Sequence, residues 1–218
     1  MKSVFMLAVS ACWLYSSFAA AETLDSYSGQ VLTVVTHKLP NMFASTSGRN
    51  APRLGAVSPG LEGKKLVEEN QIPDPTLAVA TRLAPVIAAR SKASNTVSFG
   101  DVDPLATGDV AKLVNGKGPI LEIWTFMWGF RRVSTDFEHY VVRYEAMARI
   151  LDPAGNPLAG AHCAIVSKDV LAYDDLTADH AAGLKSQFAA DASTCADALA
   201  GALLAPSAKA DAASKAEQ

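Results

Sequence analysis

The chain has 218 residues, of which 50% are hydrophobic and 19% are charged, and its formal net charge is −3 at pH 7. This length suits one domain with a sizeable core, which we expect over residues 22–204. A mildly acidic composition provides no cationic surface for phosphate backbones or anionic lipid, so it argues against nucleic-acid binding and electrostatic membrane attachment.

The first 21 residues have the layout of a secretory signal peptide. Lys2 precedes an apolar stretch over 4–18, and three alanines end at Ala21, where we expect cleavage. Losing Lys2 from 19 bases that stand against 22 acids leaves a net charge of −4. A lipobox-like VSAC sequence ends at Cys12, so acylation of Cys12 is an alternative, and an uncleaved anchor is another. The leader predicts a periplasmic or secreted protein, with membrane association only if Cys12 is lipidated.

The next segments predict a strand, a long loop and a helix. Residues 31–36 are apolar and β-branched, which indicates a first strand. Residues 37–71 contain repeated Pro and Gly with little periodicity, so we expect a long loop that is either a surface excursion or a flap. Asp74 followed by Pro75 is typical of a helix start. The apolar face of this helix runs on past Pro85, which should kink or split it.

A second helix start lies at Asp103 and Pro104. This shorter helix should extend to about Val114, because Asn115-Gly116 is typical of a left-handed helix end. The two starts share the same Asp-Pro signal, in which the aspartate caps the helix and the proline occupies its first position.

The C-terminal half predicts a meander of three strands. Residues 120–132 are apolar at both alternating sets of positions, which favours a strand inside its sheet and covered on both faces. Residues 139–151 alternate, which predicts one buried and one wetter face. A turn over 133–136 joins these strands as a hairpin, and the turn at 152–157 leads to a third strand at 158–166.

A long helix should cover the meander. Apolar residues recur three or four positions apart from Leu184 to Leu203. The tail over 205–218 is polar and alanine-rich, so we expect disorder. The predicted fold class is α/β (α+β), a single domain with a mostly antiparallel sheet and a C-terminal three-stranded meander covered by helices.

Two cysteines remain if Cys12 leaves with the leader. Cys163 lies in the third meander strand, and Cys195 lies on the apolar stripe of the long helix. In an oxidising compartment we expect a structural Cys163–Cys195 disulfide, worth on the order of 3 kcal/mol. A redox pair or a metal site is the alternative, but the sequence lacks the Cys-x-x-Cys spacing and a ligand cluster.

Aromatic residues of the strand at 120–132 form the candidate binding surface. The Trp and Phe residues at 124, 126, 128 and 130 share one parity, so a regular strand places them on one face. Arginines of the neighbouring strand could stack on their rings, and such surfaces often bind partners. The alternative is that these aromatics are core under the helices. The candidate residues are Trp124, Phe126, Trp128, Phe130, Arg143 and Arg149.

Motifs for chemistry are absent from the sequence. It contains no Gly-x-Ser-x-Gly, His-Glu-x-x-His, phosphate loop or Gly-x-Gly-x-x-Gly, so we assign no catalytic residue, no metal ligand and no cofactor. The polar group Asp136, Glu138 and His139 indicates a solvated hairpin, with an acid–base site as the alternative. We expect His162 to be a partly buried histidine and not a ligand.

Acidic residues gather where the long helix should begin. Carboxylates at this position interact favourably with the helix dipole and cap free N–H groups, which is reason enough for them. A calcium or zinc site is the alternative, although the spacing of a known calcium loop is missing. The residues concerned are Asp174, Asp175, Asp179 and His180.

A family resemblance covers about residues 30–204 and rests on the order of the predicted elements. The elements concerned are the helix that Ile-Pro-Asp-Pro opens at 72–75, the strand at Trp124, the strand from Tyr140 to Ile150, and the segment from Cys163 to Cys195. This order resembles the TolB N-terminal-like group and related small lipoproteins of the bacterial envelope. The resemblance implies a domain that docks onto envelope partners without catalysis, and it transfers no catalytic residue.

We therefore expect a secreted or periplasmic, non-catalytic binding or assembly-accessory protein of the bacterial cell envelope. Its partner would be another envelope protein. One alternative is a periplasmic carrier of a small apolar ligand, in which residues 37–71 close over the aromatic strand. Another is an uncharacterised periplasmic hydrolase that uses Asp136 and His139.

Overall fold

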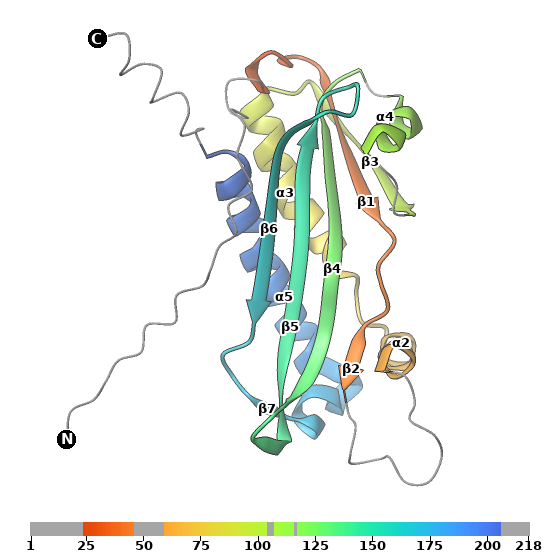
Figure 1. Ribbon diagram of the computed structural model, residues 1–218, viewed down its shortest axis with the longest axis vertical. Helices are drawn as coiled ribbons and strands as arrows, with labels where there is room; N and C mark the ends of the chain where they lie inside the picture. The colour runs from red at the N-terminus through yellow and green to blue at the C-terminus, as the bar shows by residue number, and fades with distance from the viewer. Residues whose placement is uncertain (1–23, 46–58, 104–106, 116, 206–218) are drawn as a thin grey trace, which may run out of the picture.

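The computed structural model describes residues 24–45, 59–103, 107–115 and 117–205 (Figure 1). The predicted leader and its cleavage point, Cys12, Pro104 of the second helix start, and the tail after residue 205 lie outside the described residues.

Seven strands in the described residues form one mixed sheet, and their central order is β3-β1-β4-β5-β6. The two short strands β2 and β7 pair with β4 and β5. The strands are β1 (Val31–His37), β2 (Phe43–Ser45), β3 (Asn95–Val102), β4 (Ile120–Val133), β5 (Asp136–Leu151), β6 (Pro157–Val166) and β7 (Leu171–Ala172).

The expected α+β fold class is confirmed. Strands β4, β5 and β6 form the predicted antiparallel meander, whereas β1 runs parallel to both β3 and β4. Strand β3 at one edge was not predicted from the sequence, because its residues are exposed except for Val102 and show no burial pattern.

Four helices in the described residues accompany this sheet. Helices α3 and α5 lie together behind the sheet in Figure 1, and α4 lies beside β1 and β3. We call the sheet face under α3 and α5 the inner face and the opposite face the outer face. The helices are α2 (Pro59–Asn70), α3 (Pro75–Ser91), α4 (Thr107–Val114) and α5 (Tyr173–Leu203).

The inner face holds the main core. Along β5, the even-numbered residues from Tyr140 to Ile150 are almost fully buried, as the alternation predicted. The apolar stripe of α5 covers them, and each of its predicted members from Leu184 to Leu203 is buried. Among the described residues, the outer face is covered at one end, where α4 packs Val110 and Val114 against Val35.

A β-bulge in β4 changes the expected arrangement of its aromatic residues. Pairing with β5 passes from Thr125 opposite Ala146 to Met127 opposite Glu145, which leaves Phe126 as an extra residue. An extra residue reverses which side chains face each side of a sheet. Trp124 therefore lies on the outer face and Trp128 on the inner face, so the predicted single aromatic face is wrong.

The predicted long loop over 37–71 is also partly wrong, because it contains β2 and α2. Strand β2 pairs with β4 through Phe43 opposite Gly129. A Cβ at Gly129 would lie 1.9 Å from the Phe43 carbonyl oxygen, and Gly129 has φ +149°. Glycine therefore lets β2 approach β4, and this requirement is not visible from local periodicity.

The start of α3 and the end of α4 follow the sequence signals, whereas α4 begins at Thr107, after the predicted start at Asp103 and Pro104. Asp74 caps α3 by accepting a hydrogen bond from the Thr76 backbone N–H at 2.7 Å. Helix α3 continues through Pro85 to Ser91, so of the expected kink or split the split does not occur. Helix α4 ends at Val114, and Asn115 follows it with φ 44°, the predicted left-handed end.

The predicted disulfide is confirmed. Cys163 on the inner side of β6 is bonded to Cys195 of α5, with a Cα–Cα distance of 5.5 Å. It ties the edge strand of the sheet to the longest helix.

Candidate functional site

The six residues of the candidate binding surface divide between the two faces of the sheet. Trp128 is only 1% exposed, packs on Phe188 with ring centroids 5.1 Å apart, and donates its indole N–H to the Pro40 carbonyl at 2.7 Å. Phe130 is equally buried and packs on Tyr140. These two aromatics belong to the core, which was the alternative left open for the whole set.

Trp124 and Phe126 remain on the outer face together with both arginines. Pairing with β4 and the alternation of β5 place Arg143 and Arg149 on this side. The Arg149 guanidinium lies 5.1 Å from the centroid of the Trp124 ring. The expected arginine–indole contact therefore forms at this pair, while a role of the surface in binding stays a prediction.

Beside Trp124 lies a buried carboxylate that was not predicted from the sequence. The Glu122 side chain is 1% exposed, and its Oε1 lies 2.6 Å from Nε2 of His37 at the end of β1. Its Oε2 accepts a hydrogen bond from Nε of Arg149. The His37 ring packs edge-on against Trp124, with centroids 5.9 Å apart. The available signal was one acidic residue inside an otherwise apolar strand.

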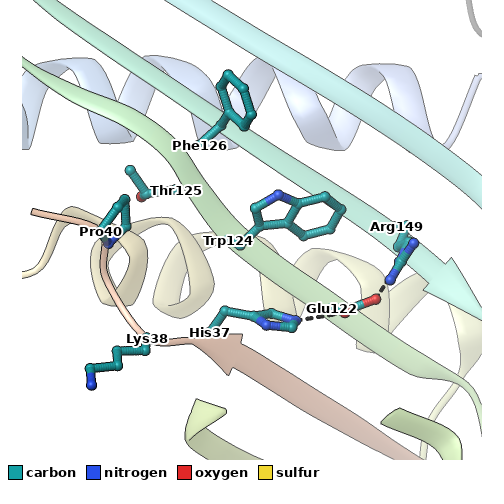
Figure 2. A pocket seen from close by; sticks show the side chains of 8 residues that line it. All are labelled: His37, Lys38, Pro40, Glu122, Trp124, Thr125, Phe126 and Arg149. Carbon is teal, nitrogen blue, oxygen red and sulfur yellow. Dashed lines mark hydrogen bonds and ion pairs between the residues drawn. The ribbon is translucent and has the colours of Figure 1, made fainter. Parts of the chain in front are cut away.

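These side chains surround an open cavity of about 450 Å³. Figure 2 shows the Trp124 ring above the His37–Glu122 pair, with Arg149 at one end and Phe126 farther out. The cavity is built by three separated segments, since β1, β4 and β5 each contribute side chains. Its lining residues are His37, Lys38, Pro40, Glu122, Trp124, Thr125, Phe126 and Arg149.

The charge state of Glu122 follows from its partners. Burial raises the pKa of a carboxyl group, but hydrogen bonds from His37 and Arg149, together with their charges, outweigh burial here. The pKa of Glu122 is therefore lowered from its ordinary value of 4.5. The carboxylate is ionised at neutral pH and holds His37 and Arg149 in place.

The cavity lining offers no free hydroxyl or thiol among its eight side chains. Among the eight lining side chains, the only hydroxyl is that of Thr125. It lies 2.7 Å from the Thr76 hydroxyl and 3.2 Å from the Tyr144 hydroxyl, within the core and away from the solvent side. A histidine paired with a carboxylate can act as a base only if a substrate or nucleophile reaches it.

A second charged group lies farther along the outer face. Glu145 is buried, accepts hydrogen bonds from Arg143, and has its Oε2 3.6 Å from Nε2 of His162. His162 is exposed, so the predicted partial burial is wrong. Successive side chains of a strand point to opposite faces, and Cys163 points to the inner face, so His162 lies on the solvent side of β6.

The other polar groups are placed as follows. Asp136 Oδ2 lies 2.6 Å from His139 Nδ1 at the β4–β5 hairpin, and both side chains are nearly half exposed, in agreement with solvated hairpin polarity. Asp174 and Asp175 occupy the first turn of α5, and Asp179 lies in a left-handed break within it. No cluster of three or more His, Cys, Asp or Glu side chains suited to a metal ion occurs in the part of the protein that the structure describes.

Replacing Glu122 with glutamine should lower the free energy of unfolding by about 2 kcal/mol at pH 7, because the charge-assisted hydrogen bonds are lost. A lowered carboxyl pKa contributes stability that is present above the unfolded-state pKa and disappears as pH falls through the folded-state pKa. The difference between wild type and Glu122→Gln should therefore shrink below about pH 4.5. Urea unfolding at several pH values measures it.

The exposed Glu68 of α2, paired with Lys64, provides the control, since Glu68→Gln should change stability little at any pH. A difference for Glu122→Gln that grows towards low pH would mean that Glu122 is held protonated and would contradict this account.

Comparison with known proteins finds similarity of structure only. No protein-family model matches the sequence, and no curated protein is significantly similar to it. Protein XCC0632 from Xanthomonas campestris, of family DUF330, is 11% identical with TM-score 0.35, over 78% of this protein and 83% of its own length. Lipoprotein GNA1162 from Neisseria meningitidis is 11% identical with TM-score 0.33. The match covers 75% of this protein and 96% of the lipoprotein.

A minor lipoprotein from Acinetobacter baumannii is 9% identical with TM-score 0.32, over 79% of this protein and 91% of its own length. Two of these three proteins are thus described as lipoproteins, the class named in the expected resemblance, and the TolB N-terminal-like part of that resemblance stays a prediction. At such low scores and identities we transfer no function.

Within the described residues, no helix is long and apolar enough to cross a bilayer.

Proposed function

We propose that this protein is a non-catalytic binding or assembly-accessory protein of the bacterial cell envelope, and that it docks an envelope protein on its outer sheet face around Trp124 and Phe126. The secretory layout of the first 21 residues and the Cys163–Cys195 disulfide support the compartment.

One observation carries the docking surface. Phe126 is 60% exposed on the β4 bulge, directly beside the cavity built on buried Glu122. Bulges re-aim side chains and are frequent next to functional sites. A large exposed aromatic beside a fixed charged group is typical of a binding anchor.

The two alternative functions fit the structure less well. A carrier of an apolar ligand was expected to use the whole aromatic strand, but Trp128 and Phe130 are packed into the core. A hydrolase using Asp136 and His139 would rely on an exposed pair at the hairpin. We keep both as outcomes that experiments can detect.

Site-specific photocrosslinking in intact cells tests the docking surface. A photoreactive phenylalanine analogue at Phe126 should give a discrete adduct of higher mass, and Trp124→Ala in the same protein should reduce its yield several-fold. Leu61 of α2 is the matched control, since it is 61% exposed and lies on another element. Adducts that are absent at position 126, or the same at both positions, would overturn the docking surface.

A further inference from the structure

The hydrogen-bonding groups of the cavity are unbalanced. Both carboxylate oxygens of Glu122 are occupied, one by His37 and the other by Arg149. The Pro40 carbonyl accepts from the Trp128 indole, and the Thr125 hydroxyl is engaged with Thr76 and Tyr144. These acceptors all have partners within the protein.

The groups that remain on Arg149, Lys38 and Trp124 are donors. Only Nε of Arg149 is used by Glu122, and a guanidinium carries further N–H groups on its two terminal nitrogens. Over the described ranges of the sequence, no protein acceptor binds these Arg149 nitrogens, the Lys38 ammonium or the Trp124 indole N–H. Since Arg149 balances Glu122, the Lys38 charge makes this side of the cavity net positive. The cavity therefore suits a ligand group with acceptors and negative charge.

The remaining lining is apolar. Trp124, Phe126 and Pro40 surround the donors, and the volume of about 450 Å³ is in the range of small-ligand pockets. We infer that this cavity binds a carboxylate carried on an apolar group, with the carboxylate on Arg149 and Lys38 and the apolar group against Trp124 and Phe126. This rests on the proposed function and names what the docked partner presents.

A carboxylate suits the site better than a phosphate dianion. The two oxygens of a carboxylate match the planar fork of a guanidinium. The ionised Glu122 lies next to that fork, so a second negative charge on the ligand would be repelled. In a partner protein this chemistry occurs at the terminal carboxylate of a polypeptide whose last residue is apolar, and it also occurs in free aromatic acids.

The test uses N-acetylphenylalanine, its neutral amide and 3-phenylpropionate as probes of the ¹⁵N-labelled full-length protein. Binding is followed by NMR at the indole N–H signal that Trp124→Phe removes. We expect a saturable shift with both acids and about tenfold weaker binding of the amide, because a charge-assisted hydrogen bond is lost. Preference for N-acetylphenylalanine over 3-phenylpropionate points to a peptide terminus as the source, and the reverse points to a free acid.

Variants identify the cations. Lys38→Gln is expected to weaken N-acetylphenylalanine binding about threefold, and Arg149→Lys about tenfold, because the lysine lacks the fork. Lys38 is exposed and has no side-chain partner in the described residues, so its replacement leaves the fold intact. Lys168→Gln is the matched control, since Lys168 is also exposed and does not line the cavity.

Equal binding of acid and amide, an absent shift with every probe, or binding unaffected by Lys38→Gln would each overturn the carboxylate inference. Success of the crosslinking at position 126 together with any of these results would leave the docking surface standing and remove only its ligand class. If the crosslinking at position 126 and the carboxylate binding both fail, the proposed function is overturned as well.

Discussion

Replacing Trp128 with alanine is expected to lower the free energy of unfolding by about 4 kcal/mol, since truncating a buried aromatic removes burial and leaves a cavity. Trp128 is 1% exposed, contacts Phe188 of α5, and donates to the Pro40 carbonyl, which would lose its partner. The same change at Trp124, on the outer face, should cost about 1 kcal/mol, the size of its contact with Arg149. Denaturant unfolding of both variants measures the difference.

The pair of tryptophans is its own control, because the two residues are four positions apart on one strand. If Trp128→Ala does not fold, Trp128→Phe should still fold with a loss of about 1 to 2 kcal/mol. A loss at Trp124 equal to or larger than that at Trp128 would contradict the bulge at Phe126 and the division of the aromatics between the faces.

Removing the disulfide should cost about 3 to 4 kcal/mol. The bond closes a loop with a sequence separation of 32, and in the chain-entropy account a loop of this length restricts the unfolded state by about that amount. The double variant Cys163→Ala with Cys195→Ala tests this by urea unfolding without reductant. Reduction of the wild type should give a loss of similar size.

The double variant also serves as the control for the reductant, since dithiothreitol should not change its stability. Hydrogen exchange should become faster first in β6, the edge strand that the bond ties to α5. An unchanged free energy of unfolding after loss of both sulfurs would show that packing of α5 alone holds β6.

Sequence reasoning recovered the elements whose signals are local. The alternation along β5, the apolar stripe of α5 and the Asp74 cap of α3 each depend on neighbours within a turn or a strand. It missed β3 and β2, because an exposed edge strand and a three-residue strand carry no such pattern. Their pairing depends on β1 and β4, which lie elsewhere in the sequence.

The candidate site was half found from the sequence. Trp124, Phe126 and Arg149 were identified because aromatics and arginines on adjacent strands are visible as a pattern. Glu122 and His37 were missed, because they are 85 residues apart in the sequence and meet only through the parallel pairing of β1 with β4.

The sequence by itself predicted a secretory leader, which stays a prediction, and it determined the disulfide partners and the antiparallel meander under a long helix. These follow from composition, cysteine count and short-range periodicity. Only the tertiary structure decided which aromatics are core and which form a surface, because one extra residue at Phe126 reverses the side-chain phase of β4 relative to β5. It also decided which donors of the cavity stay available, since both oxygens of Glu122 have partners from distant strands and the terminal nitrogens of Arg149 have no protein acceptor in the described residues.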